Sequence, residues 1–305
     1  MALGRGRLVF SSSKGSTRSA LRTLQGSLVS SLTSGVNGVA VALFTTFFPS
    51  DCRLCGSPLM NISRLPVCDQ CLSSIRPIGS GLCSVCGERL RGPYALSGGS
   101  DVLCGLCRRL EPPYVKAAAY GSYEGGLREL IHLLKYDGVR PAANVLGRML
   151  AEAIAALPLP LAGNRVVVVP VPLHPRKRRQ RGFNQTELIA HAALKLSGAH
   201  RFELQPGMER TRETQSQIGL SRHQRRENLR GAFAVIAPQA ICGREVLLVD
   251  DVFTTGTTVS ECARVLRRAG ATRVYVATVA RTLKLEAEPA RWEPEAAVMT
   301  MAAAS

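Results

Sequence analysis

The sequence has few aromatic residues and no long apolar run, and each shortage argues against a class of protein. Aromatic residues make up 5% of the 305 positions, with a single tryptophan at Trp292. Such scarcity argues against an extended platform on which nucleic-acid bases stack. The best apolar run, Val39–Phe48, is interrupted by threonines and is far shorter than the ~20 residues that a helical membrane span needs. We therefore expect no membrane span.

Acidic residues are missing from the first fifty positions, which carry five basic side chains among many Ser, Thr and Gly residues. No convincing signal peptide is present, and the composition fits a transit peptide, a disordered basic arm or a start placed too early. We predict a poorly ordered extension over residues 1–48 that contains a short apolar helix near Gly38–Phe48. The tail, residues 283–305, is rich in Ala, Glu and Pro, and we expect it to be loosely ordered.

The sequence also lacks any evident Ser/His/Asp or Cys/His arrangement, so we expect no covalent protein nucleophile. What it has instead is positive charge, with a formal net charge of +17. This excess points to polyanionic or phosphorylated partners without distinguishing nucleic acid from a small phosphorylated molecule.

Eight of the ten cysteines form four Cys-x-x-Cys pairs. The pairs are Cys52/Cys55, Cys68/Cys71, Cys83/Cys86 and Cys104/Cys107. Twelve residues separate the first two pairs and seventeen separate the last two, which is typical of zinc ribbons in a reducing compartment. Four thiolates leave a zinc ion no open position, so we predict two structural Zn²⁺ ions. Sequential pairing of the motifs is our prediction; interleaved pairing and a redox dithiol are the alternatives.

The stretch Arg244–Thr258, REVLLVDDVFTTGTT, combines a strand, two acids and a small loop. Val246–Val249 is an unbroken apolar run, typical of a strand covered on both faces of a parallel sheet. Asp250 and Asp251 follow where this strand would end, and apolar residues recur at helical spacing over 259–269. Between them lie Thr254, Thr255, Gly256, Thr257 and Thr258. Because helix N-termini bind anions, the sequence predicts a phosphate site at this loop.

The two acids would repel that phosphate, so we expect them to bind sugar hydroxyls or hydrated Mg²⁺. A ligand with hydroxyls on one side and a monophosphate on the other is a phosphorylated ribose. The alternative is a buried strand that ends at an ordinary helix N-cap, where Asp and Thr are common. That alternative accounts for one Asp and one Thr, but not for two acids followed by four threonines around a glycine.

The segment VLLVDDVFTTGTT resembles the motif that binds 5-phosphoribosyl pyrophosphate (PRPP) in type I phosphoribosyltransferases, and its surroundings resemble the ComF family. Three more blocks carry the resemblance: LIxxLKY over Leu130–Tyr136, PVPLHP with RGFNQ over Pro170–Gln185, and RxxxTxxQxxLxxxxRxxN over Arg210–Asn228. The resemblance extends from about Pro49 to Arg281 and leaves both ends of the chain unexplained.

The resemblance implies an α/β protein with the type I phosphoribosyltransferase fold, a parallel sheet flanked by helices, preceded by a small cysteine-rich double zinc ribbon. We expect the ribbon over residues 49–111 and the transferase-like domain over 112–282, with Glu111-Pro112-Pro113 as the linker. Expected strands lie near residues 114–123, 166–169, 246–249 and 273–279. Expected helices cover residues 127–135, 142–157 and 186–196, and residues 170–185 are expected to form a loop around Gly182.

In such transferases the loop after the strand equivalent to 166–169 receives pyrophosphate, and guanidinium groups match phosphate oxygens well. The alternative is a solvated basic loop or a nucleic-acid patch. Residues 208–233 suit a mobile lid that excludes water, with a fixed surface helix as the alternative. Lys135 could reach a phosphate or lie solvated at a helix end, and His174 is expected to be structural. The candidate pyrophosphate or lid residues are Arg176, Arg181, Gln185, Arg210, Gln217, Arg225 and Asn228.

The resemblance implies displacement of pyrophosphate from PRPP at the ribose C1, with Asp250 and Asp251 as catalytic residues acting directly or through Mg²⁺. The acceptor is not identified by the sequence. ComF-like proteins are associated with DNA uptake, which implies single-stranded DNA and DNA-uptake proteins as partners. The rival function is therefore a non-catalytic protein that handles single-stranded DNA or senses nucleotides. In either case we expect a cytoplasmic protein.

Overall fold

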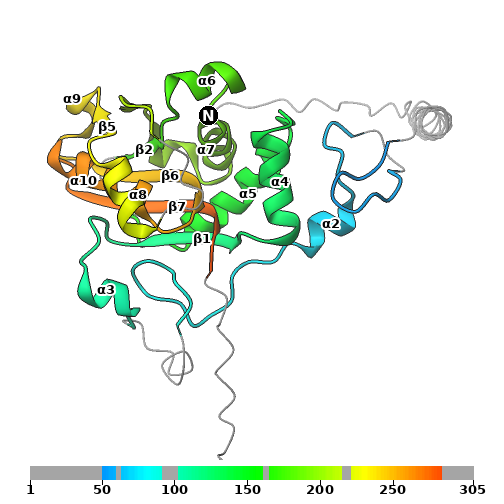
Figure 1. Cartoon of the computed structure of the whole chain (residues 1–305), viewed down its shortest axis with the longest axis horizontal. Helices are drawn as coiled ribbons and strands as arrows, with labels where there is room; N and C mark the ends of the chain where they lie inside the picture. Colours follow the sequence, from blue (N-terminus) through cyan, green and yellow to red (C-terminus); the bar gives the residue numbers. More distant parts are fainter. Residues whose placement is uncertain (1–49, 60–62, 91–101, 161–164, 215–220, 284–305) are drawn as a thin grey trace, which may run out of the picture. The chain divides into compact units, whose positions relative to one another are not determined.

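A computed structural model describes residues 50–59, 63–90, 102–160, 165–214 and 221–283 of the protein (Figure 1). The chain divides into two compact units between Cys68 and Asp69. The predicted extension over 1–48, residues 284–305 of the predicted tail and Gln217 lie outside the described residues. Within the described part of the chain, every helix is too short or too polar to cross a bilayer. The domain boundaries expected from the sequence remain predictions.

A five-stranded sheet lies at the centre of the second unit, and all of its neighbouring strands run parallel. In spatial order the strands are β1 (Ala117–Ser122), β7 (Arg273–Arg281), β6 (Glu245–Phe253), β2 (Val166–Pro170) and β3 (Phe202–Leu204). β6 is the middle strand, which agrees with its apolar run, because a central parallel strand is covered on both faces. The four expected strands are confirmed, whereas the short edge strand β3 has no counterpart in the sequence prediction.

Helices cover both faces of this sheet, as expected. The four longest among the described residues are α4 (Gly125–Lys135), α5 (Ala142–Ala155), α7 (Gln185–Leu196) and α10 (Thr257–Arg268). Val246 and Leu248 of β6 belong to the same core cluster as Cys262 of α10. Leu247 points to the opposite face, because side chains alternate along a strand, and it is fully buried on the side where α7 contacts β6.

The basic run after β2 is a helix, which corrects the expectation of a loop. α6 spans Pro175–Arg181, and Pro175 occupies its first turn, where the missing N–H leaves no helical hydrogen bond unmade. The His174 side chain caps α6 by accepting a hydrogen bond from the backbone N–H of Arg176, which gives this imidazole a structural role. Gly182 ends the helix with a left-handed φ of 78°, as the expected unusual backbone angle requires.

The segment expected as a lid is partly anchored. β4 (Met208–Arg210) and β5 (Phe233–Val235) pair antiparallel, and α8 (Arg222–Leu229) lies between them in sequence. α8 contacts α10, and Leu229 at its end is fully buried. Closure of the segment over a site stays a prediction, because residues 215–220 lie outside the described residues. The remaining short helices of the described chain are α2 (Asp69–Ser74), η2 (Ala199–Arg201), α3 (Gly105–Arg109) and α9 (Pro238–Ile241).

Gly147 marks a close crossing of α5 and α7. A Cβ atom at Gly147 would lie 2.4 Å from the Cβ of Ala192 and 3.0 Å from the backbone nitrogen of Ala193. Gly147→Ala should therefore push the helices apart and lower the free energy of unfolding by about 1–3 kcal/mol, measured by urea denaturation. Gly105→Ala is the matched control, because a Cβ there meets nothing within 4 Å. A loss no larger than that of the control would contradict the close crossing.

Candidate functional site

The carboxyl end of β6 carries two acids with different surroundings. Asp250 and Asp251 lie inside the strand rather than after it, so their side chains point to opposite faces of the sheet. Asp251 is only 5% exposed. Its backbone N–H donates to Oδ1 of Asp250 over 2.9 Å, which ties the two residues together. The strand therefore fixes both carboxyl groups near the carboxyl end of the parallel sheet.

Two side chains from neighbouring helices hold the buried carboxylate of Asp251. Nζ of Lys135, at the end of α4, lies 2.8 Å from Asp251 Oδ2, and Nε2 of Gln185, at the start of α7, donates to the same oxygen over 2.8 Å. The Lys135 side chain is 15% exposed, so it is not a solvated lysine at a helix end. The LIxxLKY match was the signal that pointed to Lys135, but the sequence did not identify its partner.

These surroundings move the pKa values of the two acids in opposite directions. Burial, followed by the charge of Asp251, raises the pKa of Asp250 to about 8. Burial alone would also raise the pKa of Asp251, but the Lys135 ammonium and the hydrogen bond from Gln185 lower it below its usual value. Burial would lower the pKa of Lys135, yet the Asp251 carboxylate outweighs it and raises that pKa. At neutral pH the site thus holds a charged pair beside a mostly protonated Asp250.

A threonine-rich segment links β6 to α10, and we call residues 254–258 the 254–258 loop. Thr254, Thr255 and Gly256 connect the two elements, and Thr257 and Thr258 belong to the first turn of α10. Gly256 is the N-cap residue of α10, with a left-handed φ of 74°, and a Cβ there would lie 2.6 Å from Cζ of Phe253. Both features require glycine. The hydroxyl oxygens of Thr255 and Thr257 lie 2.8 Å apart. Because the N-cap residue is glycine, it has no side chain that could accept a hydrogen bond from the first turn of the helix. The loop therefore combines clustered hydroxyls with the positive end of a helix dipole.

Three of the predicted pyrophosphate or lid residues lie close to the acids. Arg181 donates to the side-chain oxygen of Gln185, whose nitrogen in turn holds Asp251. Arg210 stacks over the ring of Phe233, with 5.5 Å between the guanidinium carbon and the ring centroid. Burial lowers the pKa of Arg210, and the nearby charge of Asp250 acts against this shift. Nε of Arg210 is buried without a hydrogen-bond partner among the described residues. These side chains border the acid pair.

The other predicted residues are not brought to the acids by any described contact. Arg176 is exposed on α6 and pairs with Glu213 at 3.5 Å. Arg225 and Asn228 lie on α8, and Nε of Arg225 is buried without a partner in the described part of the chain. Gln217 falls outside the described residues. The structure therefore places Arg181, Gln185 and Arg210 near the acids, and leaves the remaining assignments as predictions.

The eight paired cysteines form two clusters that follow the sequential grouping of the motifs. Within each cluster all sulfur atoms lie within 4.8 Å of one another. One cluster is Cys52, Cys55, Cys68 and Cys71, and the other is Cys83, Cys86, Cys104 and Cys107. Four thiolates with no other donor are the ligand set of a closed structural zinc site.

Both clusters repeat the same local geometry. A glycine follows the second cysteine in each, with left-handed φ values of 75° at Gly56 and 69° at Gly87. A backbone N–H also donates to a sulfur over 3.3 Å in each cluster, from Cys68 to Cys52 and from Cys104 to Cys83. Such bonds stabilise thiolates, so both sites fit structural zinc.

Removing the cation of the ion pair between Lys135 and Asp251 should lower the stability of the protein. Lys135→Met leaves the Asp251 carboxylate buried without a countercharge and should lower the free energy of unfolding by about 3–5 kcal/mol in urea denaturation. Adding Asp251→Asn should recover much of that loss. Arg128→Met, which removes an ion pair to Glu129 whose side chains are about half exposed, is the control and should cost less than about 1 kcal/mol. An equal, small loss in both single variants would contradict the buried pair.

Comparisons with known proteins agree with both parts of this arrangement. Residues 43–109 match the model of the double zinc ribbon domain, and residues 210–301 match that of the phosphoribosyl transferase domain. The solved structure of the allosteric regulatory enzyme of purine biosynthesis is 26% identical, covering 46% of this chain and 26% of its own, with a TM-score of 0.29. The fold is that of a type I phosphoribosyltransferase, preceded by cysteine-rich zinc-ribbon sites.

Two relatives extend the match along most of the chain. DNA utilization protein YhgH of Salmonella typhi is 34% identical over 77% of this chain and 98% of its own length. Competence protein F of Haemophilus influenzae is 31% identical over 70% of this chain and 96% of its own length. The chain matches a double zinc ribbon and a phosphoribosyltransferase domain, and it aligns with these relatives over nearly their whole length. It therefore belongs to the ComF family.

Proposed function

We propose that the site at the carboxyl end of β6 binds PRPP with Mg²⁺ and supports displacement of pyrophosphate at the ribose C1. The observation that carries the proposal is the pair of acids at the end of β6, where buried Asp251 is held by Lys135 and Gln185 with Asp250 beside it, followed after two residues by a threonine-glycine loop at a helix N-terminus. A ligand with hydroxyls beside a monophosphate satisfies both halves of that arrangement at once.

The loop and the acids would divide the ligand between them. Thr254, Thr255, Gly256, Thr257 and Thr258 would hold the 5-phosphate with hydroxyls and backbone N–H groups. Asp251, fixed by Lys135, would present a constant negative charge below the ribose. Asp250 would bind the ribose hydroxyls or Mg²⁺, and Mg²⁺ when bound would neutralise the charge of the pyrophosphate.

Displacement at C1 needs no covalent bond to the protein. The bond between C1 and the pyrophosphate oxygen breaks, pyrophosphate leaves with the bonding electrons, and a lone pair of the acceptor forms the new bond to C1. Positive charge that develops on the ribose is stabilised by the carboxylates, and charge on the leaving group by cations. Lys135 is already paired with Asp251, whereas Arg181 and Arg210 are further cations next to the acids, so we assign the pyrophosphate contacts to these two side chains first.

PRPP with Mg²⁺ should raise the melting temperature of the protein. At a ligand concentration one hundred times Kd, binding adds about 2.7 kcal/mol of stability. Asp250→Asn should abolish the rise, whereas Glu129→Gln, on the exposed side of α4, should leave it unchanged. Absence of a shift in the wild-type protein would end the proposal.

The same titration should depend on pH. Because the pKa of Asp250 is raised to about 8, this carboxyl is protonated at lower pH and must lose its proton to bind Mg²⁺. The affinity for PRPP with Mg²⁺ should therefore increase as pH rises through about 8 and should level off only about one pH unit above the pKa of Asp250. Asp250→Asn should show no such increase in its residual binding.

The relatives' names favour a second candidate function, handling of DNA. One relative is named a DNA utilization protein and another a competence protein. In this chain the residues suited to a nucleic-acid backbone are those of the basic helix α6, whose exposed side chains include Arg176, Lys177, Arg178 and Arg179. On this alternative the transferase fold would serve binding or nucleotide sensing, with no group transferred.

Binding of single-stranded DNA should then weaken steeply with salt. Replacing Arg176, Lys177, Arg178 and Arg179 by Gln should flatten the plot of log K against log salt by about 0.7 for each phosphate contact that is lost, measured by fluorescence anisotropy. Arg148→Gln and Arg268→Gln, on exposed positions of α5 and α10, are the controls. Binding that ignores both salt and the α6 substitutions would exclude this function.

A further inference from the structure

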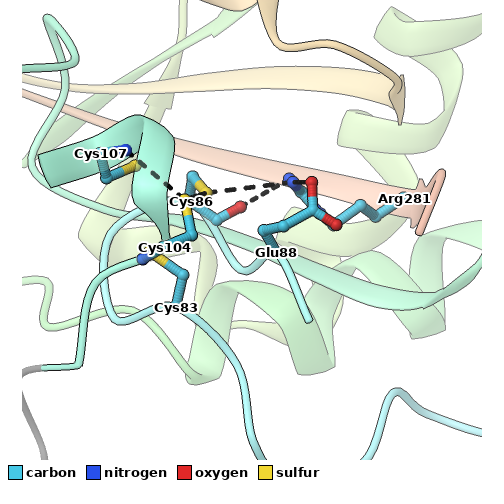
Figure 2. Close-up of polar contacts among 6 residues, drawn as sticks. All are labelled: Cys83, Cys86, Glu88, Cys104, Cys107 and Arg281. Atoms are coloured by element: carbon cyan, nitrogen blue, oxygen red, sulfur yellow. Dashed lines mark hydrogen bonds and ion pairs between the residues drawn. The ribbon is translucent and has the colours of Figure 1, made fainter. Parts of the chain in front are cut away.

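Arg281 is a buried cation that nothing in the proposed chemistry uses. It is the last residue of β7 and is 3% exposed. Its side chain reaches the second cysteine cluster, where Nη1 donates to the carbonyl oxygen of Cys86 over 2.6 Å and Nη2 lies 2.9 Å from Oε2 of Glu88 (Figure 2). Nη2 also donates to Sγ of Cys86 over 3.9 Å. The guanidinium thus joins the transferase sheet to one zinc knuckle.

A cation at this position suits a zinc site made only of thiolates. Four thiolates around Zn²⁺ leave a net charge of −2, because four negative charges exceed the two positive charges of the ion. A guanidinium that donates to a ligand sulfur and to its carbonyl oxygen stabilises that charge and orients the ligand. Glu88, two residues after Cys86 in the same knuckle, forms an ion pair with the guanidinium. Gly87 between them closes the turn, because its N–H donates to the carbonyl of Cys83 over 2.9 Å.

The same guanidinium supports the loop of the proposed phosphate site. Its central carbon lies 4.4 Å from the centroid of the Phe253 ring, within the range of a cation–π contact. Phe253 is the partner of Arg281 in the β6–β7 ladder, and its carbonyl accepts a hydrogen bond from the backbone N–H of Thr282. Gly256 packs directly on the Phe253 ring, since a Cβ there would overlap the ring carbons.

A cavity makes this support necessary. Its volume is about 550 Å³, and its lining includes Thr255, Gly256 and Thr257 of the loop, Phe253 and Arg281, and Cys86 of the zinc knuckle. On the side of this cavity the loop borders open space rather than packed side chains. The Phe253 ring beneath Gly256, held in place by Arg281, is therefore a principal packed support of the loop.

We infer that Arg281 is a positioning residue that couples zinc at the Cys83–Cys107 site to the geometry of the 254–258 loop. Zinc held by the four cysteines would fix Cys86 and thereby the knuckle that carries Glu88. These two residues hold the guanidinium, and the guanidinium packs on the Phe253 ring against which Gly256 lies. The part of the inference that concerns phosphate affinity rests on the proposed function. Because coupling between two sites is reciprocal, a ligand on the loop must in turn stabilise the zinc site.

The test uses the full-length, zinc-loaded protein and the variant Arg281→Met. Because removal of a partner of a metal ligand typically costs about tenfold or more in metal affinity, zinc release to a chromophoric chelator should become faster by a similar factor. Amide hydrogen exchange in the peptide covering residues 253–258, followed by mass spectrometry, should accelerate. The Kd for PRPP with Mg²⁺ should increase about fivefold or more. Arg89→Met, an exposed change on the same knuckle and the same cavity, should alter none of these.

Reciprocity separates coupling from a merely structural contact. In the wild-type protein, PRPP with Mg²⁺ should slow both zinc release and amide exchange over residues 83–88, and in Arg281→Met this protection should vanish. Arg281→Lys keeps the positive charge but loses the planar guanidinium that bonds Cys86 and Glu88 at once, so it should restore part of this protection. If Arg281→Met fails to fold, Glu88→Gln tests the same link, since it removes the ion pair and leaves the guanidinium in place.

The outcomes distinguish this inference from the proposed function. If the wild-type protein does not bind PRPP, the proposed function fails, and the zinc-release and loop-exchange measurements still decide whether Arg281 couples the two regions. Wild-type exchange over residues 253–258 in zinc-loaded Arg281→Met, or in Glu88→Gln if that variant is needed, would overturn the inference whatever PRPP does.

Discussion

A carboxylate buried at the end of a central strand persists only if a cation compensates it, and the Asp251–Lys135 contact of 2.8 Å provides that compensation. Through Lys135 this carboxylate holds the end of α4, and through Gln185 it holds the start of α7, so both helices meet at the carboxyl end of β6. Because Asp251 keeps its charge, Asp250 beside it resists ionisation until a cation or a higher pH arrives. One ion pair thus sets both the geometry and the electrostatics of the proposed site.

The apolar pattern of the sequence was enough to predict the main strands of the sheet. Val166–Val169 and Val246–Val249 are β-branched or leucine runs without alternation, and such runs occur in strands that are covered on both faces. They indeed lie side by side as β2 and β6. The two acids and the threonine-glycine loop could be located for the same reason, since polar residues directly after a buried run fall at the edge of the sheet.

Contacts between distant segments could not be predicted in this way. The partner of Lys135 lies more than one hundred positions along the chain, and no local pattern encodes that pairing. The sequence likewise gives Arg281 no role beyond the end of a strand, yet it contacts Cys86 and Glu88 of the zinc knuckle. The helix α6 was missed because basic side chains and flanking prolines suggest a loop, whereas a capped helix that begins at Pro175 satisfies the same residues.

The pairing of β1 with β7 has a consequence for how the protein is made. Ala117 pairs with Val276, so the first strand of the sheet to leave the ribosome must wait for a partner 159 positions further along the chain. Long-range parallel pairing of this kind forms slowly and exposes an unpaired strand edge in the meantime. The cysteine clusters close over short loops and can bind metal during synthesis. We therefore expect the second zinc knuckle to be assembled before the sheet, ready for Arg281 to dock on it when β7 emerges.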